Sequence, residues 1–282
     1  MSDALAWLSW ENPVAVWWIG LISISVLNMA FWFFTKIKTI TPLSAPLNKF
    51  MVAFSGFYVF GCAYRSFFPK ADVQRICLFD TWLSSVFLGR TVATVAELSF
   101  VLQWALILYF YGKYLNNRIP QIMAQIIVVL ITVAECFSWY AVITTNYLGN
   151  MIEESLWAVS YAIIGMSLLL FWKNFDRLFK YLIAVSVFGC ALYVFFMTTV
   201  DVPMYFNRWQ MDLADNKIHF TIWQGLIDLN TRWVVTHSIK DWYQEIPWKT
   251  LYFTCAVWVS LALCYVPLTI SQLKKHLKDG TI

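Results

Sequence analysis

The chain has 282 residues, of which 60% are hydrophobic and only 13% are charged. About a quarter of the residues of an average soluble domain are charged, so a water-soluble fold of this size could not cover its surface. The formal net charge of +4 is too small, and too evenly spread over the loops, to indicate nucleic-acid binding. The composition therefore predicts an all-α integral membrane protein.

Seven apolar segments follow one another along the chain, with lengths suited to helices that cross a hydrocarbon core about 30 Å thick. They cover residues 13–34, 50–68, 87–112, 121–145, 155–172, 181–202 and 248–269. We predict a single polytopic domain over residues 1–282, formed by a bundle of seven transmembrane helices. No basic residue precedes the first segment, as a cleavable signal peptide would require, so we expect the first helix to remain.

The loops divide by charge. Those after the first, third and fifth segments, together with the tail, hold basic residues and almost no acidic ones, whereas the alternate loops hold nearly all the carboxylates. The positive-inside rule then places the N-terminus outside and the C-terminus in the cytoplasm, in an inner or plasma membrane. The segment over residues 79–112 is longer than one bilayer thickness, so its helix either starts above the membrane or breaks near Gly89.

Residues 204–247 form the only sizeable extramembrane piece. Its aromatic residues predict short interfacial helices that lie on the outer membrane surface or cap the bundle. His237 and Asp241 in this piece have the i, i+4 spacing of helical metal ligands, and His219 lies nearby in the chain. No spacing marks the further ligand that a metal needs, so we expect no metal at these residues, and that question stays open.

Cysteines and histidines indicate neither a disulfide framework nor a cofactor. The six cysteines are scattered singly, and buried free thiols are the simpler interpretation, although Cys62 and Cys77 could pair if their segments meet. No histidine lies within a predicted span, which argues against bis-histidine haem. We therefore predict no cofactor.

Ionisable residues inside a bilayer are costly and are therefore candidates for function. In the third segment Arg90 and Glu97 lie seven residues apart on one helical face, with Thr94 between them. The fourth segment carries Glu135, followed one turn later by Trp139. At 1.5 Å per residue, both glutamates would lie about 13 to 15 Å below the outer surface.

Arg65 and Asp80 would lie at the mouth above these glutamates. We predict a polar pocket that opens outward, in which Glu97 and Glu135 are catalytic and ligand binding falls to Arg65, Arg90, Asp80, Thr94 and Trp139. Burial would raise the glutamate pKa values and the arginines would lower them, so one glutamate could act as an acid or base near neutral pH. The alternative is that Glu97 pairs with Arg90 two turns away and Glu135 with another helix, which would only set the packing of the bundle.

Three functions fit this pattern. The leading hypothesis is a pocket that binds or processes a lipid or small amphiphile, with membrane lipids as the natural partners. The second is proton- or ion-coupled transport, with a route through Gln103, Gln125 and Asn28. The third is an accessory or sensor subunit that contacts another membrane protein.

Overall fold

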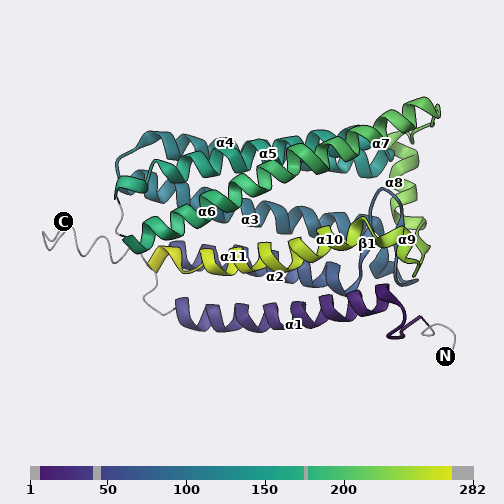
Figure 1. Ribbon diagram of the computed structural model, residues 1–282, viewed down its shortest axis with the longest axis horizontal. Coiled ribbons are helices and arrows are strands. Elements are labelled where there is room, and N and C mark those ends of the chain that lie inside the picture. The colour runs from purple at the N-terminus through teal and green to yellow at the C-terminus, as the bar shows by residue number, and fades with distance from the viewer. Residues whose placement is uncertain (1–6, 41–45, 175–176, 269–282) are drawn as a thin grey trace, which may run out of the picture. The chain divides into compact units, whose positions relative to one another are not determined.

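The computed structural model describes residues 7–40, 46–174 and 177–268, in which helices dominate. The long helices are α1 (Pro13–Thr39), α2 (Pro46–Phe67), α3 (Val86–Tyr114), α4 (Arg118–Thr144), α5 (Tyr147–Leu169) and α6 (Arg177–Phe196). After α6 the chain continues through a π-helical turn (Met197–Asp201) into α7 (Val202–Ala214). The last long stretch is α10 (Glu245–Leu251), a second π-helical turn (Tyr252–Ala256) and α11 (Val257–Leu263). The short elements are β1 (Lys70–Ala71), β2 (Ile76–Cys77), β3 (Val234–Val235), α8 (Ile222–Thr231), α9 (Ile239–Trp242) and the 3₁₀ turns Trp82–Ser84 and Trp172–Asn174 (Figure 1).

Within the described residues, six helical stretches are long and apolar enough to cross a membrane. They are Pro13–Thr39, Val86–Tyr114, Arg118–Thr144, Tyr147–Leu169, Phe179–Ala214 and Glu245–Leu268. These features are those of a predominantly helical, multi-pass integral membrane protein. The predicted second span forms α2, which is not one of the six, so the count of seven stays a prediction. Residues 1–6 and 269–282, which carry the two ends of the predicted topology, lie outside the described residues.

Several predicted boundaries are wrong. The fifth helix begins at Tyr147 because Asn146 caps it by accepting a hydrogen bond from the Leu148 N–H, as N-cap residues do. The sixth predicted segment does not end at residue 202, since helix continues to Ala214, well into the predicted loop 204–247. The third helix begins at Val86 and runs through Gly89 without a break.

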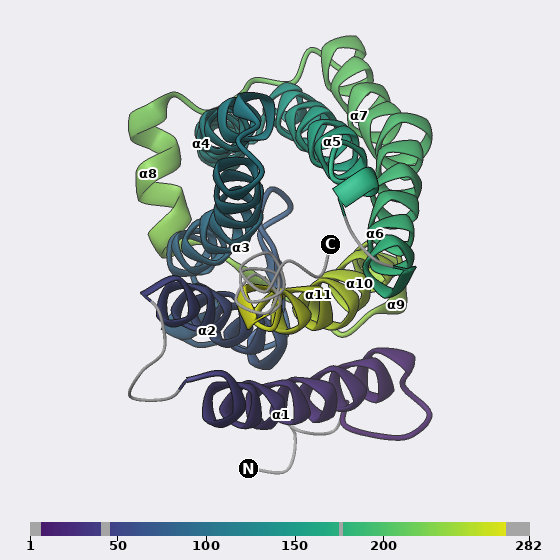
Figure 2. The ribbon, with the colours of Figure 1, turned by 90° about the vertical axis from the view of Figure 1, so that its left-hand side faces the viewer.

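The chain divides into two compact units, Met1–Gln103 with Leu229–Ile282 and Trp104–Asp228. In the first unit α1, α2 and the α10–α11 stretch lie side by side (Figure 2). Gly56 lets Trp32 of α1 approach α2 closely, since a Cβ at this glycine would come 2.9 Å from the indole ring. The Trp32 indole N–H donates to the Val52 carbonyl at 3.0 Å.

The middle of the first unit is held by neutral polar side chains. Gln103 is fully buried and donates to the carbonyl oxygens of Met51 on α2 (3.0 Å) and Ser260 on α11 (3.1 Å). Its own carbonyl accepts from the Ser260 hydroxyl at 2.6 Å. Asn28 of α1 donates to the carbonyl of Phe253 in the second π-helical turn at 2.9 Å and accepts from the Trp258 indole N–H. These bonds satisfy polar groups that lipid could not solvate.

One end of the first unit is closed by a small sheet and an aromatic cluster. β1 pairs antiparallel with β2, and β2 pairs parallel with β3. Trp242 of α9 is fully buried against Val14 and Leu78, and its indole N–H donates to the Thr236 carbonyl. The sheet and this cluster join the loop before α3 to the segment before α10.

In the second unit α4 and α5 form a tight antiparallel pair. Thr145 at the turn has a left-handed φ of 58°. Gly149 permits close approach, because a Cβ there would lie 2.6 Å from the Phe137 carbonyl oxygen. Gly165 of α5 similarly faces Cys190 of α6. All six cysteines of the chain are free, four of them buried and two, Cys136 and Cys255, exposed.

Candidate functional site

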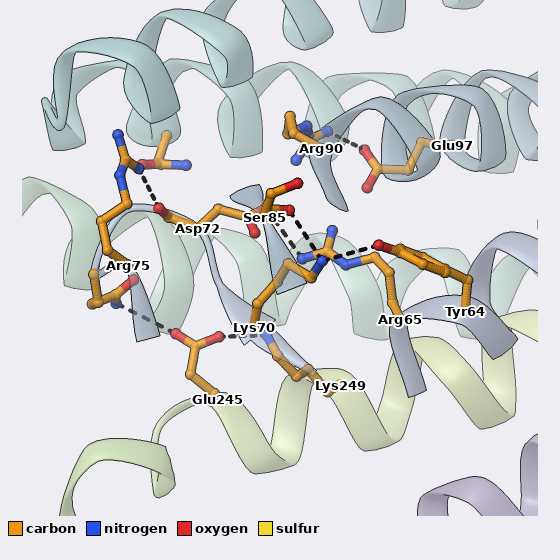
Figure 3. A network of polar contacts seen from close by, with 12 residues as sticks. Tyr64, Arg65, Lys70, Asp72, Arg75, Ser85, Arg90, Glu97, Glu245 and Lys249 are labelled. Carbon is orange, nitrogen blue, oxygen red and sulfur yellow. Dashed lines mark hydrogen bonds and ion pairs between the residues drawn. The ribbon is translucent and has the colours of Figure 1, made fainter. Parts of the chain in front are cut away.

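The charged cluster of the first unit is a group of eight ionisable side chains from the end of α2, the β1–β2 hairpin, the start of α3 and α10 (Figure 3). Its members are Arg65, Lys70, Asp72, Arg75, Arg90, Glu97, Glu245 and Lys249. The β1–β2 hairpin, which lies in the loop between α2 and α3, carries three of the members. The other five come from the neighbouring helices, one from α2 and two each from α3 and α10. Five members are basic and three are acidic.

Lys70 is the most enclosed member of the cluster. Its side chain is fully buried, and Nζ donates to the carbonyl oxygens of Leu83 (2.8 Å) and Ser85 (3.1 Å) and to the Tyr64 hydroxyl (3.2 Å). None of these acceptors is a carboxylate. Burial lowers the pKa of Lys70 to about 7, an effect that the nearby Asp72 carboxylate only partly opposes.

Gly89 makes the Lys70 site possible. A Cβ at this position of α3 would lie 2.4 Å from Lys70 Cδ and 3.0 Å from Nζ, far inside ordinary contact distance. The absence of a side chain at Gly89 therefore leaves the space that the lysine fills.

Arg65 and Asp72 form a buried ion pair with a single contact, 3.2 Å between Nη2 and Oδ2. The second carboxylate oxygen of Asp72 and the Nε of Arg65 are buried, and neither has a hydrogen-bond partner. Burial raises the pKa of the Asp72 carboxyl, but nearby cations lower it more, so that it ends below its ordinary value. These cations are Arg65, Arg90, Lys249 and Lys70, in decreasing order of effect.

Two further ion pairs belong to the cluster. Arg90 and Glu97, two turns apart on α3, meet at 2.9 Å, as the packing alternative predicted for this pair. Lys249 and Glu245 of α10 meet at 2.7 Å, and Glu245 also accepts from the Gln74 side chain at 3.4 Å. Glu97 is the most open of these carboxylates, with 21% of its side chain exposed.

The other predicted site residues lie in several places. Asp80 accepts a hydrogen bond from the Trp233 indole N–H at 2.9 Å, and Thr94 lies half-buried between Arg90 and Glu97. Glu135, which is buried, and Trp139, which is half-buried, belong to α4 in the second unit. The predicted meeting of Glu97 with Glu135 stays a prediction.

Two of the three residues that raised the metal question, His237 and Asp241, have protein partners. His237 stacks on Trp7 with ring centroids 4.1 Å apart, and its Nε2 is 2.9 Å from the Leu78 carbonyl oxygen. Asp241 accepts from the Thr236 hydroxyl at 2.5 Å. His219 belongs to the second unit.

Sequence reasoning missed the hairpin residues Lys70, Asp72 and Arg75 and the pair of Lys249 with Glu245. A signal was present, because Lys70 and Arg75 are basic residues in a loop that the positive-inside rule places outside. Basic residues that depart from that rule indicate that specific contacts stabilise their charge.

Comparison with known proteins gives no family for this chain. No family model matches it, and no curated protein or solved structure shows significant similarity to it.

Proposed function

We propose that this protein crosses the membrane seven times, N-terminus outside, and uses the charged cluster to bind the polar headgroup of a lipid or small amphiphile. α2 would be the seventh span. Its 22 residues extend about 33 Å at 1.5 Å per residue. It also packs against α1 and α11, which belong to two of the apolar stretches.

The observation that carries the proposal lies in residues 82–87, where carbonyl oxygens that bind a buried ammonium group lie next to exposed apolar side chains. The Leu83 and Ser85 carbonyls hold the Lys70 ammonium, while the neighbouring side chains of Trp82, Leu83 and Phe87 are exposed by 61%, 38% and 41%. An amphiphile needs both surfaces side by side, one for its headgroup and one for its apolar part.

The hydrogen bonds in the middle of the first unit support binding over transport. A charge-conducting route through Gln103 and Asn28 would have to break the bonds that these side chains make between helices. Both amides are bonded through donor and acceptor, which suits a packing role in a bundle closed at this depth.

Processing of the ligand would use Glu97 or Glu135 as general acid or base, as the sequence predicts. The direct check is Glu97→Gln and Glu135→Gln, each of which should abolish turnover of an identified ligand while leaving binding in place. Unchanged turnover in both variants would leave binding alone as the function.

The binding proposal is tested by purifying the full chain in mild detergent and identifying the co-purified lipids by mass spectrometry. We expect bound amphiphile in the wild type and a large loss in Arg65→Gln. The matched control is Asp212→Asn, which breaks the ion pair between Asp212 of α7 and Lys217, just after the helix, and should leave occupancy unchanged. Equal occupancy in all three proteins, or none in the wild type, would refute the proposal.

A further inference from the structure

We propose that the charged cluster binds an oxyanion of the phosphate type, with the Arg65 guanidinium as its main ligand and Asp72 as the internal anion that competes for it. This inference rests on the proposed function and adds the chemical class of the headgroup. The phosphate can belong to a lipid or be free in solution, and the experiment below separates the two.

The first support is the balance of charge. Five basic side chains face three carboxylates in the cluster. Arg90 pairs with Glu97 and Lys249 pairs with Glu245, whereas the Lys70 ammonium bonds the neutral oxygens of Leu83, Ser85 and Tyr64. A buried excess of positive charge is costly unless an anion offsets it. Lys70 therefore brings a buried basic group to the cluster with no carboxylate bonded to its ammonium.

The second support is the geometry of Arg65. It touches Asp72 through one Nη alone, and its Nε is buried with no hydrogen-bond partner. Arginine binds carboxylate or phosphate best through two parallel N–H bonds from one edge of the guanidinium. Here that edge is only half used. An oxyanion that engages Nε as well would complete it.

The third support is the state of Asp72. Its side chain is 91% buried, with 9% exposed, and Oδ1 accepts no hydrogen bond even though four cations act on this carboxylate. A carboxylate placed only to satisfy its surroundings would use both oxygens. Asp72 is better explained as a resident counter-ion that repels a second anion and must be offset when the ligand enters.

Access is available at the edge of the cluster. The Arg65 side chain is 14% exposed and Glu97 is 21% exposed, whereas Lys70 is fully enclosed. A ligand would therefore contact Arg65 directly, and the enclosed Lys70 would act on it only through its charge.

The test measures binding to the full purified chain of three probes. These are dihexanoyl phosphatidic acid, dihexanoyl phosphatidylcholine and inorganic phosphate, with the lipids kept below their micelle concentrations. We expect the phosphatidic acid to bind at least about 10-fold more tightly than the phosphatidylcholine. Arg65→Gln should weaken the anionic lipid by about 10- to 100-fold, the range of a lost charge-assisted hydrogen bond.

Asp72→Asn gives the sharpest distinction. Removing the competing carboxylate should tighten phosphatidic acid binding by several-fold. If the basic side chains serve only to pair with Asp72, the Asp72→Asn protein would bind phosphatidic acid no more tightly than the wild type. Arg65→Lys keeps the positive charge but lacks the two parallel N–H donors of the guanidinium, so its affinity for phosphatidic acid should lie between those of the wild type and Arg65→Gln. It also serves as the test if Arg65→Gln does not fold. Lys240→Gln, an exposed lysine of the same unit, is the matched control and should bind as the wild type does.

The outcomes separate this inference from the proposed function. Equal binding of the two lipids, insensitive to Arg65 and Asp72, would overturn the oxyanion inference and leave amphiphile binding intact. Phosphate that binds as tightly as phosphatidic acid, with the same dependence on Arg65, would support the oxyanion and refute the lipid. Failure of all three probes would overturn both.

Discussion

Replacing Gly89 by alanine should displace Lys70 from its buried site. The new Cβ would lie 2.4 Å from Lys70 Cδ, so the side chain must move by about 1 Å to reach ordinary contact distance. Such a shift would break one or two of the three bonds that hold the ammonium. At about 1.5–3 kcal/mol for each bond to a charged group, the loss for one or two bonds is roughly 1.5–6 kcal/mol. Alanine in a helix returns about 1 kcal/mol relative to glycine.

The net effect of Gly89→Ala is therefore a destabilisation of about 0.5–5 kcal/mol. In a Lys70→Ala background the clash is gone, and the same substitution should stabilise by up to about 1 kcal/mol. The sign of the effect thus reverses between the two backgrounds. Thermal unfolding of the four proteins of this double-mutant cycle, followed by tryptophan fluorescence in one detergent, measures it. An equal loss of stability in both backgrounds would refute the assignment of Lys70 to this space.

Three further predictions concern stability. The pKa of Lys70 is about 7 in the folded protein and near 10.4 when the side chain is exposed in the unfolded chain. Between these pH values the unfolded chain binds more protons, so the free energy of unfolding should rise with pH from about 7 upward. The rise should be larger in wild type than in Lys70→Met, and equal pH profiles of the two proteins would contradict the prediction. Gln103→Leu should cost about 1–3 kcal/mol of stability through lost interhelical bonds and leave lipid occupancy unchanged; a loss of occupancy without destabilisation would show a direct role in binding. Trp242→Ala should cost about 3–5 kcal/mol, the usual range for a buried aromatic, and a change of under 1 kcal/mol in chemical denaturation would show that the aromatic cluster does not hold this end of the unit.

Apolar runs predicted the long helices because lipid requires helical backbone wherever the chain crosses it. Their ends were less predictable. The sixth segment was predicted to end at residue 202, yet Pro203 occupies the first turn of α7 after a π-helical turn, where a missing N–H is tolerated. The resulting stretch Phe179–Ala214 has 36 residues, about 54 Å at 1.5 Å per residue, and extends beyond a core about 30 Å thick.

The candidate site was predictable only in part. Periodicity placed Arg90 and Glu97 on one face of the third helix, and they form an ion pair. The role of Lys70 could not be read in the same way, because it depends on a hairpin, on two carbonyl acceptors and on the missing side chain of Gly89. Short loops carry no periodic signal, so the contacts of their side chains appear only when the neighbouring helices are in place.

The most direct test of the account is an experimental structure of the full chain in a lipid nanodisc that contains phosphatidic acid. We predict headgroup density with a phosphate oxygen about 3 Å from Arg65 Nε. A cluster that encloses only water, with lipid density confined to the apolar outer surface, would contradict the central claim that these charges hold a headgroup.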